Sequence, residues 1–356
     1  MRDASIIIER RSGLHALKEL EACWTALHAL DPRAGAWTHP SLLIGFHRMF
    51  RPGGEPFVLA AHDEGGVLRG VLPLSIESKR VGPVMVRWAQ PLASWHSCFN
   101  DAVIDPDHAA AVLPALARAL DSVRWDELAM TRVREDAWLL DSSLGFLEHI
   151  PQLRREAGEP APRVALQPTG PLLVGPDGRE LRRTLRRLEE LGTLRVGWES
   201  PGDTGREATA EFVALHGRLK AYQRQTRTFT LGTARRDFPD WLAVESEGGR
   251  AGLYTARLNG RMLAGCVVLR AKARSFAYRA AWELDVAKYG MGVLLLTQAM
   301  VECRAAGDIT FDLGPGREPY KNKWQPSIHP LATLRVTRPT WRTRAANAWL
   351  RARGRA

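Results

Sequence analysis

Cysteine is scarce in this sequence. Only four cysteines occur among 356 residues, Cys23, Cys98, Cys266 and Cys303. They lie far apart and show none of the paired spacings that are typical of a zinc site or a disulfide framework. We therefore expect no metal, and we expect reduced thiols that are mostly buried as small apolar side chains.

Long apolar runs are also missing. No stretch approaches the roughly 18 apolar residues that a membrane-spanning helix needs. The run Ile6-Ile7-Ile8 near the N-terminus is too short for the apolar part of a signal peptide. With 45% hydrophobic and 25% charged residues, the composition is that of a globular protein. The sequence predicts a cytoplasmic protein, free or peripheral to the inner face of the membrane.

Acidic residues are scarce in the second half. Residues 166–356 contain 32 Lys and Arg against 18 Asp and Glu, a net charge of +14, whereas residues 1–165 contain 18 against 21, a net charge of −3. The basic half predicts an anionic partner. Nucleic acid, a membrane surface and a multiply phosphorylated cofactor all have this chemistry.

The pattern of the first half predicts helices mixed with antiparallel strands. Helices are expected at 14–30, 109–122 and about 136–143, and strands at 6–8, 56–62, 67–77, 84–90, 101–105 and 128–133. The turn Glu64-Gly65-Gly66 is a hairpin signal between two of these strands. Residues 151–178 are rich in proline and glycine and predict a domain junction.

The second half repeats this outline. Helices are expected at about 207–223 and 237–246, then strands at 251–258, 263–270 and 275–282, a helix at 292–305 and a strand at 309–314. Asn259-Gly260 is a strong hairpin signal. We predict an α+β (α/β mixed) fold of two similar lobes, each a mostly antiparallel sheet flanked by helices. The predicted domains are 1–165 and 166–335, followed by a basic tail at 336–356.

Two segments are strongly basic. Residues 179–191 show a helical pattern of leucines with arginines on the other face, which indicates an amphipathic helix with a solvated basic surface. The tail contains arginines up to Arg355, two tryptophans and no acid. A solvated tail and a helix on anionic lipid or nucleic acid both fit this composition.

A glycine pair opens the helix expected at 292–305. The residues are Tyr289, Gly290, Met291, Gly292 and Val293. The first N–H groups of a helix lack partners within the helix, and the helix dipole is positive at this end. The segment is therefore a candidate phosphate site, although an ordinary turn and helix cap explain the glycines equally well.

A second candidate segment, residues 312–324, follows the strand at 309–314. One short loop carries Asp312, Glu318, Tyr320, Lys321 and Trp324 after a Gly-Pro-Gly turn. Loops at strand ends are common places for functional residues. We expect the neighbouring lysines to favour the phenolate of Tyr320 and so ease release of its proton. A surface loop whose aromatic side chains pack on the sheet is the structural alternative.

Five segments in this order carry a family resemblance: LRRTLRRLEELG, FVALHGRLKAY, FAYRAAWELDVAKYGMGVLLL, FDLG and EPYKNKW. They cover most of residues 165–335 and resemble the GNAT-type acyltransferases that are grouped with CelD-like cellulose-biosynthesis proteins, relatives of the Fem aminoacyltransferases of peptidoglycan. The resemblance implies two tandem GNAT-like lobes, of which the N-terminal one is degenerate.

The resemblance also implies an acyl-CoA co-substrate, acetyl-CoA or longer. Its pyrophosphate would lie on the backbone of residues 289–293 and its pantetheine arm beside the strand 275–282. Lys288 and Tyr289 stand where the family has an arginine or glutamine. The residues assigned to the cofactor are Tyr278, Lys288, Tyr289, Gly290, Met291, Gly292, Val293 and Lys321.

The usual route in this family is direct attack of an amine on the thioester in a ternary complex. Such a step needs a neutral amine, a proton acceptor and a donor for the developing oxyanion. We assign proton acceptance to Glu318 or Asp312, with His216 as a further candidate, and assign Tyr320 as the acid for the thiolate. A backbone N–H of the strand 275–282 is the expected oxyanion donor.

The sequence thus predicts an N-acyltransferase that acylates an amine of a small molecule, amino sugar or peptide. A Fem-like transfer from aminoacyl-tRNA is one alternative, for which the helix 179–191 and the tail offer basic surfaces. A non-catalytic GNAT-fold component of an envelope or polysaccharide synthesis assembly is another, because a fold supports many functions.

Overall fold

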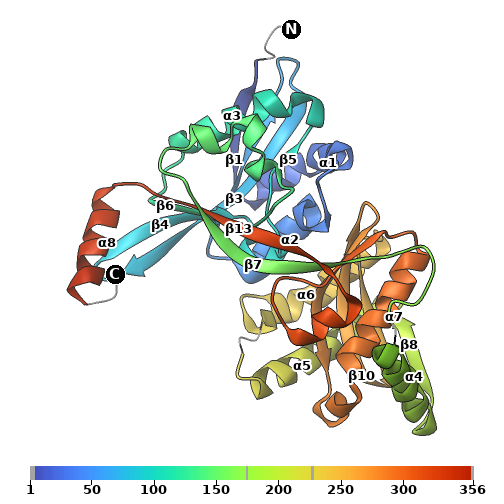
Figure 1. Ribbon diagram of the computed structural model, residues 1–356. Coiled ribbons are helices and arrows are strands. Elements are labelled where there is room, and N and C mark those ends of the chain that lie inside the picture. Colours follow the sequence, from blue (N-terminus) through green and yellow to red (C-terminus); the bar gives the residue numbers. More distant parts are fainter. Residues whose placement is uncertain (1–4, 174, 226–227, 354–356) are drawn as a thin grey trace. The chain divides into compact units, whose positions relative to one another are not determined.

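The computed structural model describes residues 5–173, 175–225 and 228–353 (Figure 1). The chain divides into two compact units. Unit 1 comprises Met1–Glu159 and Pro330–Ala356, and unit 2 comprises Pro160–His329. Strands β7 (Arg154–Ala165) and β13 (Ser327–Thr337) each have one part in either unit. The predicted boundaries at 165/166 and 335/336 therefore fall at the end of β7 and inside β13.

Unit 1 is built on a sheet with the order β1-β2-β3-β4-β6-β13-β7, in which β5 also pairs with β3. The pairs β1–β2, β2–β3, β3–β4 and β6–β13 are antiparallel, whereas β4 and β6 are parallel. Its other elements are β1 (Ile7–Ser12), α1 (Leu14–Leu30), α2 (Pro40–Phe50), β2 (Glu55–His62), β3 (Leu68–Val81), β4 (Val84–Pro91), β5 (Val103–Ile104), α3 (Ala109–Ala119), β6 (Glu127–Arg134) and α8 (Trp341–Ala352).

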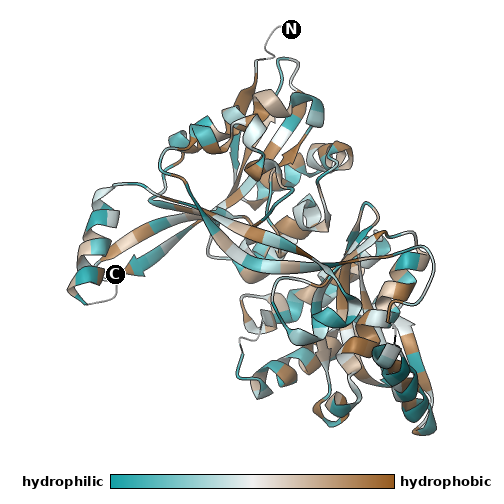
Figure 2. Ribbon diagram, viewed as in Figure 1, coloured by the Kyte–Doolittle hydropathy of each residue, from teal (hydrophilic) through white to brown (hydrophobic). Residues whose placement is uncertain are grey.

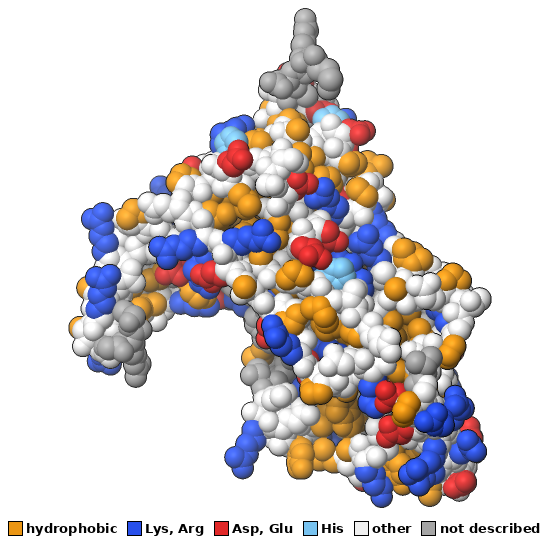
Figure 3. All heavy atoms as spheres, in the orientation of Figure 1, with side chains coloured by type: hydrophobic (Ala, Val, Ile, Leu, Met, Phe, Trp, Pro, Cys, Tyr) orange, Lys and Arg blue, Asp and Glu red, His pale blue; other side chains and the backbone are white. Residues whose placement is uncertain are grey.

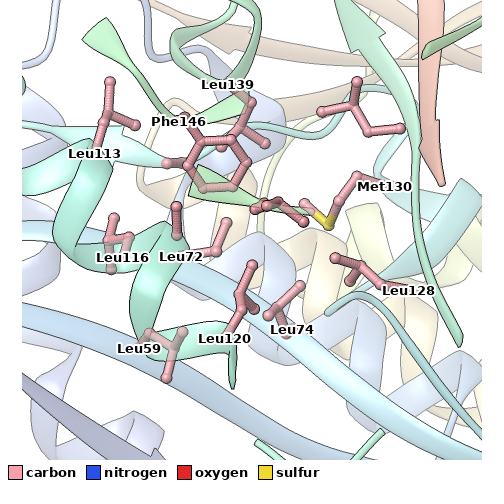
Figure 4. Close-up of a cluster of buried hydrophobic side chains, with 14 of the residues drawn as sticks. Leu59, Leu72, Leu74, Leu113, Leu116, Leu120, Leu128, Met130, Leu139 and Phe146 are labelled. Atoms are coloured by element: carbon pink, nitrogen blue, oxygen red, sulfur yellow. The ribbon is translucent and has the colours of Figure 1, made fainter. Parts of the chain in front are cut away.

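The main core of unit 1 lies between α3 and one face of the sheet (Figure 4). Leu113 and Leu116 of α3 are fully buried, and the strands contribute Leu72, Leu128 and Met130. Leu128 and Met130 are two residues apart on β6, so their side chains leave the same face of the sheet. The intervening Ala129 is on the opposite face.

The predicted tail forms helix α8 instead. Thr340 caps it by accepting a hydrogen bond from the backbone N–H of Thr343, and Ala346 packs on Val84 and Val86 of β4. The expectation of a solvated tail is therefore corrected for residues 341–352, because one side of this segment is apolar enough to cover β4. Arg355 lies outside the described residues.

Unit 2 contains a sheet with the order β7-β12-β11-β10-β9-β8. Among the described strand pairs of this sheet, only β11–β12 is parallel. Its other elements are α4 (Gly175–Glu190), β8 (Leu194–Trp198), α5 (Asp203–Tyr222), α6 (Ala234–Glu247), β9 (Ala251–Leu258), β10 (Arg261–Ala271), β11 (Arg274–Trp282), α7 (Met291–Ala305) and β12 (Thr310–Asp312).

Helices cover both faces of this sheet. Ala264 and Cys266 of β10 belong to the core that includes α7. Gly265 between them is on the other face, where a Cβ would come within 2.8 Å of the Phe212 ring of α5. Strand β10 is accordingly hydrophobic along most of its length, and Figure 2 shows the sheet mainly brown and α4 mainly teal. The predicted mixed α+β fold with mostly antiparallel sheets is confirmed.

Two segments differ in local structure from the prediction. The proline-rich segment 151–178 contains the boundary between the two units, at 159/160, but it also contains strand β7, whose Val164 pairs with Phe311 of β12. The helix expected at 136–143 is replaced by the 3₁₀ turns Trp138–Leu140 and Ser142–Leu144. Both segments depend on partners that are distant in sequence, so local patterns did not reveal them.

The remaining global expectations concern thiols and membranes. None of the four cysteines, all within the described residues, forms a disulfide; Cys98, Cys266 and Cys303 are buried, as expected, whereas Cys23 is exposed. Within the described ranges, every helix is too short or too polar to cross a bilayer.

Two glycines of α5 make a matched test of its packing. At Gly205 a Cβ would lie 2.4 Å from the backbone oxygen of Ser200, whereas at Gly217 nothing lies within 4 Å. We expect Gly205→Ala to lower the free energy of unfolding by about 1–3 kcal/mol, because the backbone must shift. Gly217→Ala should raise it by up to about 1 kcal/mol through helix propensity. Urea denaturation measures both, and equal effects of the two substitutions would contradict the described start of α5.

Candidate functional site

The start of α7 has the geometry of an anion site. Gly290 is the N-cap and has a left-handed backbone, φ 63° and ψ 37°, which a side chain would disfavour. Its carbonyl oxygen accepts hydrogen bonds from Val293 N at 2.9 Å and Leu294 N at 3.1 Å. The N–H groups of the first residues of α7 therefore point out of the helix, where the dipole is positive.

Carboxylates of α4 face this helix end. A hollow of about 60 Å³ is lined by Tyr289, Gly290 and Val293 and also by Asp177 and Glu180. Both carboxylates form ion pairs with Lys323, and the distance from Lys323 Nζ to Glu180 Oε2 is 3.5 Å. The protein thus supplies its own negative charge near the positive end of α7. A pyrophosphate bound here would have to share the hollow with these groups.

The other predicted residues of this segment have different surroundings. Met291 is buried in the core. Gly292 lies against Trp282, since a Cβ would be 3.3 Å from the indole ring. The Lys288 ammonium is exposed and lies 5.1 Å from the centre of the Tyr289 ring. Only the backbone of Met291 and Gly292 is therefore suited to contact a ligand.

Strand β11 extends beyond its parallel partner. It pairs with β12 only from Arg274 to Phe276, whereas its pairing with β10 continues to Trp282. Tyr278 lies just beyond the last paired residue, is buried, and stacks near Phe238 of α6 with ring centres 6.4 Å apart. Beyond Phe276 the edge of β11 that faces away from β10 is thus not part of a described ladder. Extended backbone at such an edge can hydrogen-bond an extended ligand.

Lys321 holds the loop that follows β12. Its buried ammonium donates hydrogen bonds to Gly314 O at 2.9 Å and Pro315 O at 3.1 Å, and forms an ion pair with Glu318 Oε2 at 2.8 Å. An ammonium has three protons, and these contacts use all of them. The predicted contact of Lys321 with the cofactor is therefore weakened, because its geometry is that of a structural group.

Tyr320 and Glu318 are held on this loop with opposite pKa shifts. Desolvation by neighbouring groups and the nearby Glu318 charge raise the pKa of Tyr320, although the residue is still 36% exposed, so the expectation that lysines favour its phenolate is corrected. Burial by itself would raise the pKa of Glu318, but the Lys321 hydrogen bond and the charges of Lys321 and Lys220 lower it. Near neutral pH Tyr320 is a neutral hydroxyl and Glu318 a carboxylate.

Lys220 of α5 and Arg279 of β11 add positive charge to the site, next to His216 of α5. Burial, Arg279 and Lys220 together lower the pKa of His216 to about 3. The imidazole is 0% exposed, and neither ring nitrogen has a hydrogen-bond partner within the described structure. Burial and Arg279 also lower the pKa of Lys220, against the attraction of Glu318. His216 is therefore a neutral base packed against Phe229, with ring centres 5.0 Å apart.

Asp312 has a structural environment. It is completely buried, and its Oδ1 is 3.2 Å from Arg163 Nε across the β7–β12 pair. An ion-paired and inaccessible carboxylate is poorly placed to accept a proton from a substrate. Of the predicted acceptors, Glu318 has the exposure that the role needs.

Lys220 and Arg279 were not singled out from the sequence. Lys220 stands four residues after His216 on α5, and Arg279 follows Tyr278 in β11. The spacing of four places His216 and Lys220 on one helix face. This spacing could be read from the sequence, whereas the packing of β11 against the same helix face could not. No cluster that could hold a metal occurs within the described residues.

Comparison with protein families identifies the part of the chain that contains this site. Residues 178–322 match the model of the acetyltransferase (GNAT) domain, and this match lies within unit 2. It covers less than half of the chain. No curated protein sequence matches.

Solved structures with the same fold extend over both units. The structure of FemX has a TM-score of 0.62 at 11% identity, covering 89% of this chain and 96% of that chain. L-PGS from Bacillus licheniformis has a TM-score of 0.56 at 14% identity, covering 94% and 97%. A tandem GNAT protein from the clavulanic acid biosynthesis pathway has a TM-score of 0.52 at 14% identity, covering 94% and 100%. The predicted tandem GNAT fold is confirmed by these likenesses.

The depressed pKa of His216 predicts a pH dependence of stability. The unfolded histidine has the ordinary pKa of 6.5, whereas the folded one has a pKa of about 3. The unfolded chain therefore binds one more proton between these values, and stability is lost as the pH falls below 6.5. From pH 7 to pH 5 this loss is about 2 kcal/mol.

We expect His216→Leu to abolish that part of the loss in urea denaturation at pH 7 and pH 5. His15→Gln, which changes an exposed histidine of α1, is the control and should leave the loss unchanged. An equal loss in the wild type and His216→Leu would show that the buried imidazole is not kept neutral.

Proposed function

We propose that the chain is an N-acyltransferase that takes its acyl group from acyl-CoA. The observation that carries this proposal is the arrangement in the GNAT domain of unit 2. There the parallel pair β11–β12 ends at Phe276 and Asp312, next to the loop with Glu318 and Tyr320. A thioester arm lying along the free edge of β11 would bring its carbonyl toward that loop. Backbone N–H groups of β11 would be the oxyanion donors.

The positive charge at the site favours the reactive form of the amine. Lys220 and Arg279 raise the free energy of an additional positive charge, so they favour a neutral substrate amine over its ammonium. The amine nitrogen attacks the thioester carbonyl, the carbon–sulfur bond breaks, and the nitrogen loses one proton. Glu318 accepts that proton, directly or through water, and passes it to solvent. The CoA thiolate leaves and takes a proton from solvent.

Tyr320 acts as a hydrogen-bond donor in this scheme. A phenol whose pKa is raised above 10 is a weaker acid than a thiol of pKa near 8.5, so full proton transfer to the thiolate is unfavourable. A neutral hydroxyl instead stabilises the developing charge on sulfur or oxygen. The role predicted from the sequence is thereby narrowed from proton donor to hydrogen-bond donor.

Measuring acyl-CoA binding together with turnover distinguishes a lost catalytic group from a protein that has failed to fold. Calorimetry with acetyl-CoA and longer acyl-CoAs should give binding to both the wild type and Tyr320→Phe. Release of free thiol in the presence of a panel of amines should fall about 10²–10³-fold in Tyr320→Phe, because one hydrogen bond to the transition state is lost. Tyr222→Phe, at an exposed tyrosine of α5, is the control and should retain the wild-type rate. Folded protein that binds none of these acyl-CoAs would disprove CoA dependence.

A second candidate is transfer of an aminoacyl group from charged tRNA. It is favoured by α4, where Arg179, Arg182, Arg183, Arg186 and Arg187 are all exposed. Their spacing of three and four residues places them on one face of the helix. Figure 3 shows blue side chains gathered over α4. The carboxylates at the start of α7 also favour a donor whose phosphates bind elsewhere.

This candidate predicts salt-dependent binding of tRNA to α4. In filter binding, changing Arg182, Arg183 and Arg186 to glutamine should weaken binding and reduce the slope of log K against log salt by roughly 2–3, since each lost phosphate contact removes about 0.7–0.9. Changing the exposed Arg48, Arg118 and Arg124 of unit 1 to glutamine removes the same total charge and is the control. If both triple variants weaken tRNA binding equally, the weakening is due to the change in net charge, and a tRNA site on α4 is rejected.

The acceptor and the biological setting are proposed from the sequence alone. A small molecule, an amino sugar or a peptide with a free amine fits the same chemistry. The resemblance to CelD-like proteins supports a place in polysaccharide or envelope synthesis.

A further inference from the structure

Unit 1 contains a cavity of about 480 Å³ on the sheet face opposite to its core. Strand β4 contributes Trp88 and Gln90, β6 contributes Ala129 and Thr131, and β13 contributes Thr333 among its alternate residues. Residues two apart on a strand share a face. The neighbouring residues Leu128 and Met130 belong to the core on the other face (Figure 4). The volume is within the range of small-molecule sites.

Two buried donor groups at this cavity have no acceptor. Gln90 is 6% exposed, and its Oε1 accepts a hydrogen bond from Ser94 Oγ at 3.2 Å. Its Nε2 has no hydrogen-bond partner within the described ranges, and the same holds for the buried Nε of Arg51. Both nitrogens are closed off from solvent, so each side chain would have to rotate to reach an acceptor in the cavity. An unsatisfied buried donor costs about 1–3 kcal/mol, and an acceptor in the cavity would make that rotation favourable.

The charges at the cavity point to the class of ligand. Arg51, Arg132 and Arg335 are paired with Glu77, Glu159 and Glu156, respectively. Lys79 is the exception within the described part of the lining, because its ammonium forms no ion pair there and lies 3.9 Å from the centre of the Trp88 ring. Partial desolvation and the charge of Arg51 lower the pKa of Lys79, which is still exposed, against the attraction of Glu77 and Glu127. An anion in the cavity would relieve this unfavourable charge.

We propose that this cavity binds a small organic anion whose carboxylate or phosphate group accepts hydrogen bonds from Gln90, Arg51 and Lys79. The rest of the ligand would lie along Ala129 and Leu331, which supply the apolar part of the lining. Unit 1 is then a ligand-binding unit rather than a degenerate spacer. This inference does not depend on the acyl donor used by unit 2.

Three probes with one ring test the proposal. They are phenyl phosphate, benzoate and neutral benzyl alcohol, titrated into the whole protein while the indole N–H signal of Trp88 is followed by NMR. Trp88→Phe assigns that signal. We expect either or both anions to shift it in a saturable way and benzyl alcohol to leave it unchanged. The anion that binds more tightly identifies the preferred group. A Trp88 signal that is unmoved by both anions, or moved equally by benzyl alcohol, would overturn the proposal.

Variants then locate the contact. Gln90→Leu should raise the dissociation constant about tenfold, since a hydrogen bond to a charged group is lost. Lys79→Met changes an exposed position at low risk to folding and should raise it by a similar factor. Arg48→Gln, an exposed arginine of α2 outside the cavity lining, is the control and should leave the constant unchanged. Equal constants for the wild type and Lys79→Met would reject this anion site, even if Gln90→Leu fails to fold.

Discussion

Each unit depends on a parallel pair of strands that is joined for only a few residues. In unit 1, β4 and β6 pair through Trp88–Glu127 and Ala89–Leu128, and in unit 2, β11 and β12 pair from Arg274 to Phe276. Parallel neighbours need a long crossover, which contains α3 in one unit and α7 in the other. Where the short pairing ends, strand edges and side chains lose a neighbour. The cavity of unit 1 and the proposed thioester edge of unit 2 both lie at such an end.

The loop after β12 places candidate catalytic side chains next to the free edge of β11. Lys321 cross-links the Gly314-Pro315 turn to Glu318, and Trp324 donates a hydrogen bond to Thr297 Oγ1 of α7 at 3.1 Å. The loop is thus held at both ends, and Tyr320 is positioned on it by an edge-to-face contact with Trp324, with ring centres 6.2 Å apart. Removing the ammonium would leave buried carbonyl oxygens without donors, which is costly. Lys321 therefore holds the geometry of the loop, and Lys220 and Arg279 supply positive charge beside it.

Local patterns predicted what depends on neighbours in sequence. The hairpin at Asn259-Gly260, the helix after Gly290 and the repeated outline of two lobes follow from turn chemistry and hydrophobic period, and the structure contains them. Strand β7 was missed because Pro160 and Pro162 argue against a strand, and its pairing with β12 joins residues far apart in sequence. The pKa of Tyr320 was predicted in the wrong direction for a related reason. The sequence shows its adjacent lysines, but the desolvation of the phenol and the approach of Glu318 arise only in the fold.

The charges around α7 bear most directly on the identity of the donor. A helix start attracts phosphate because its N–H groups lack partners, but Asp177 and Glu180 already bring two negative charges to this one and Lys323 brings one positive charge. A pyrophosphate placed there is attracted by the helix dipole and repelled by the carboxylates, so the two electrostatic contributions oppose each other. Arg179, Arg182 and Arg186 lie on the side of α4 opposite to Asp177, whereas Arg183 and Arg187 lie closer to Glu180 on the exposed surface of the helix. Helix α4 therefore repels phosphate near Asp177 and Glu180 and attracts it near its exposed arginines. Both acyl donors fit the GNAT fold, so the two are distinguished by where their phosphates bind.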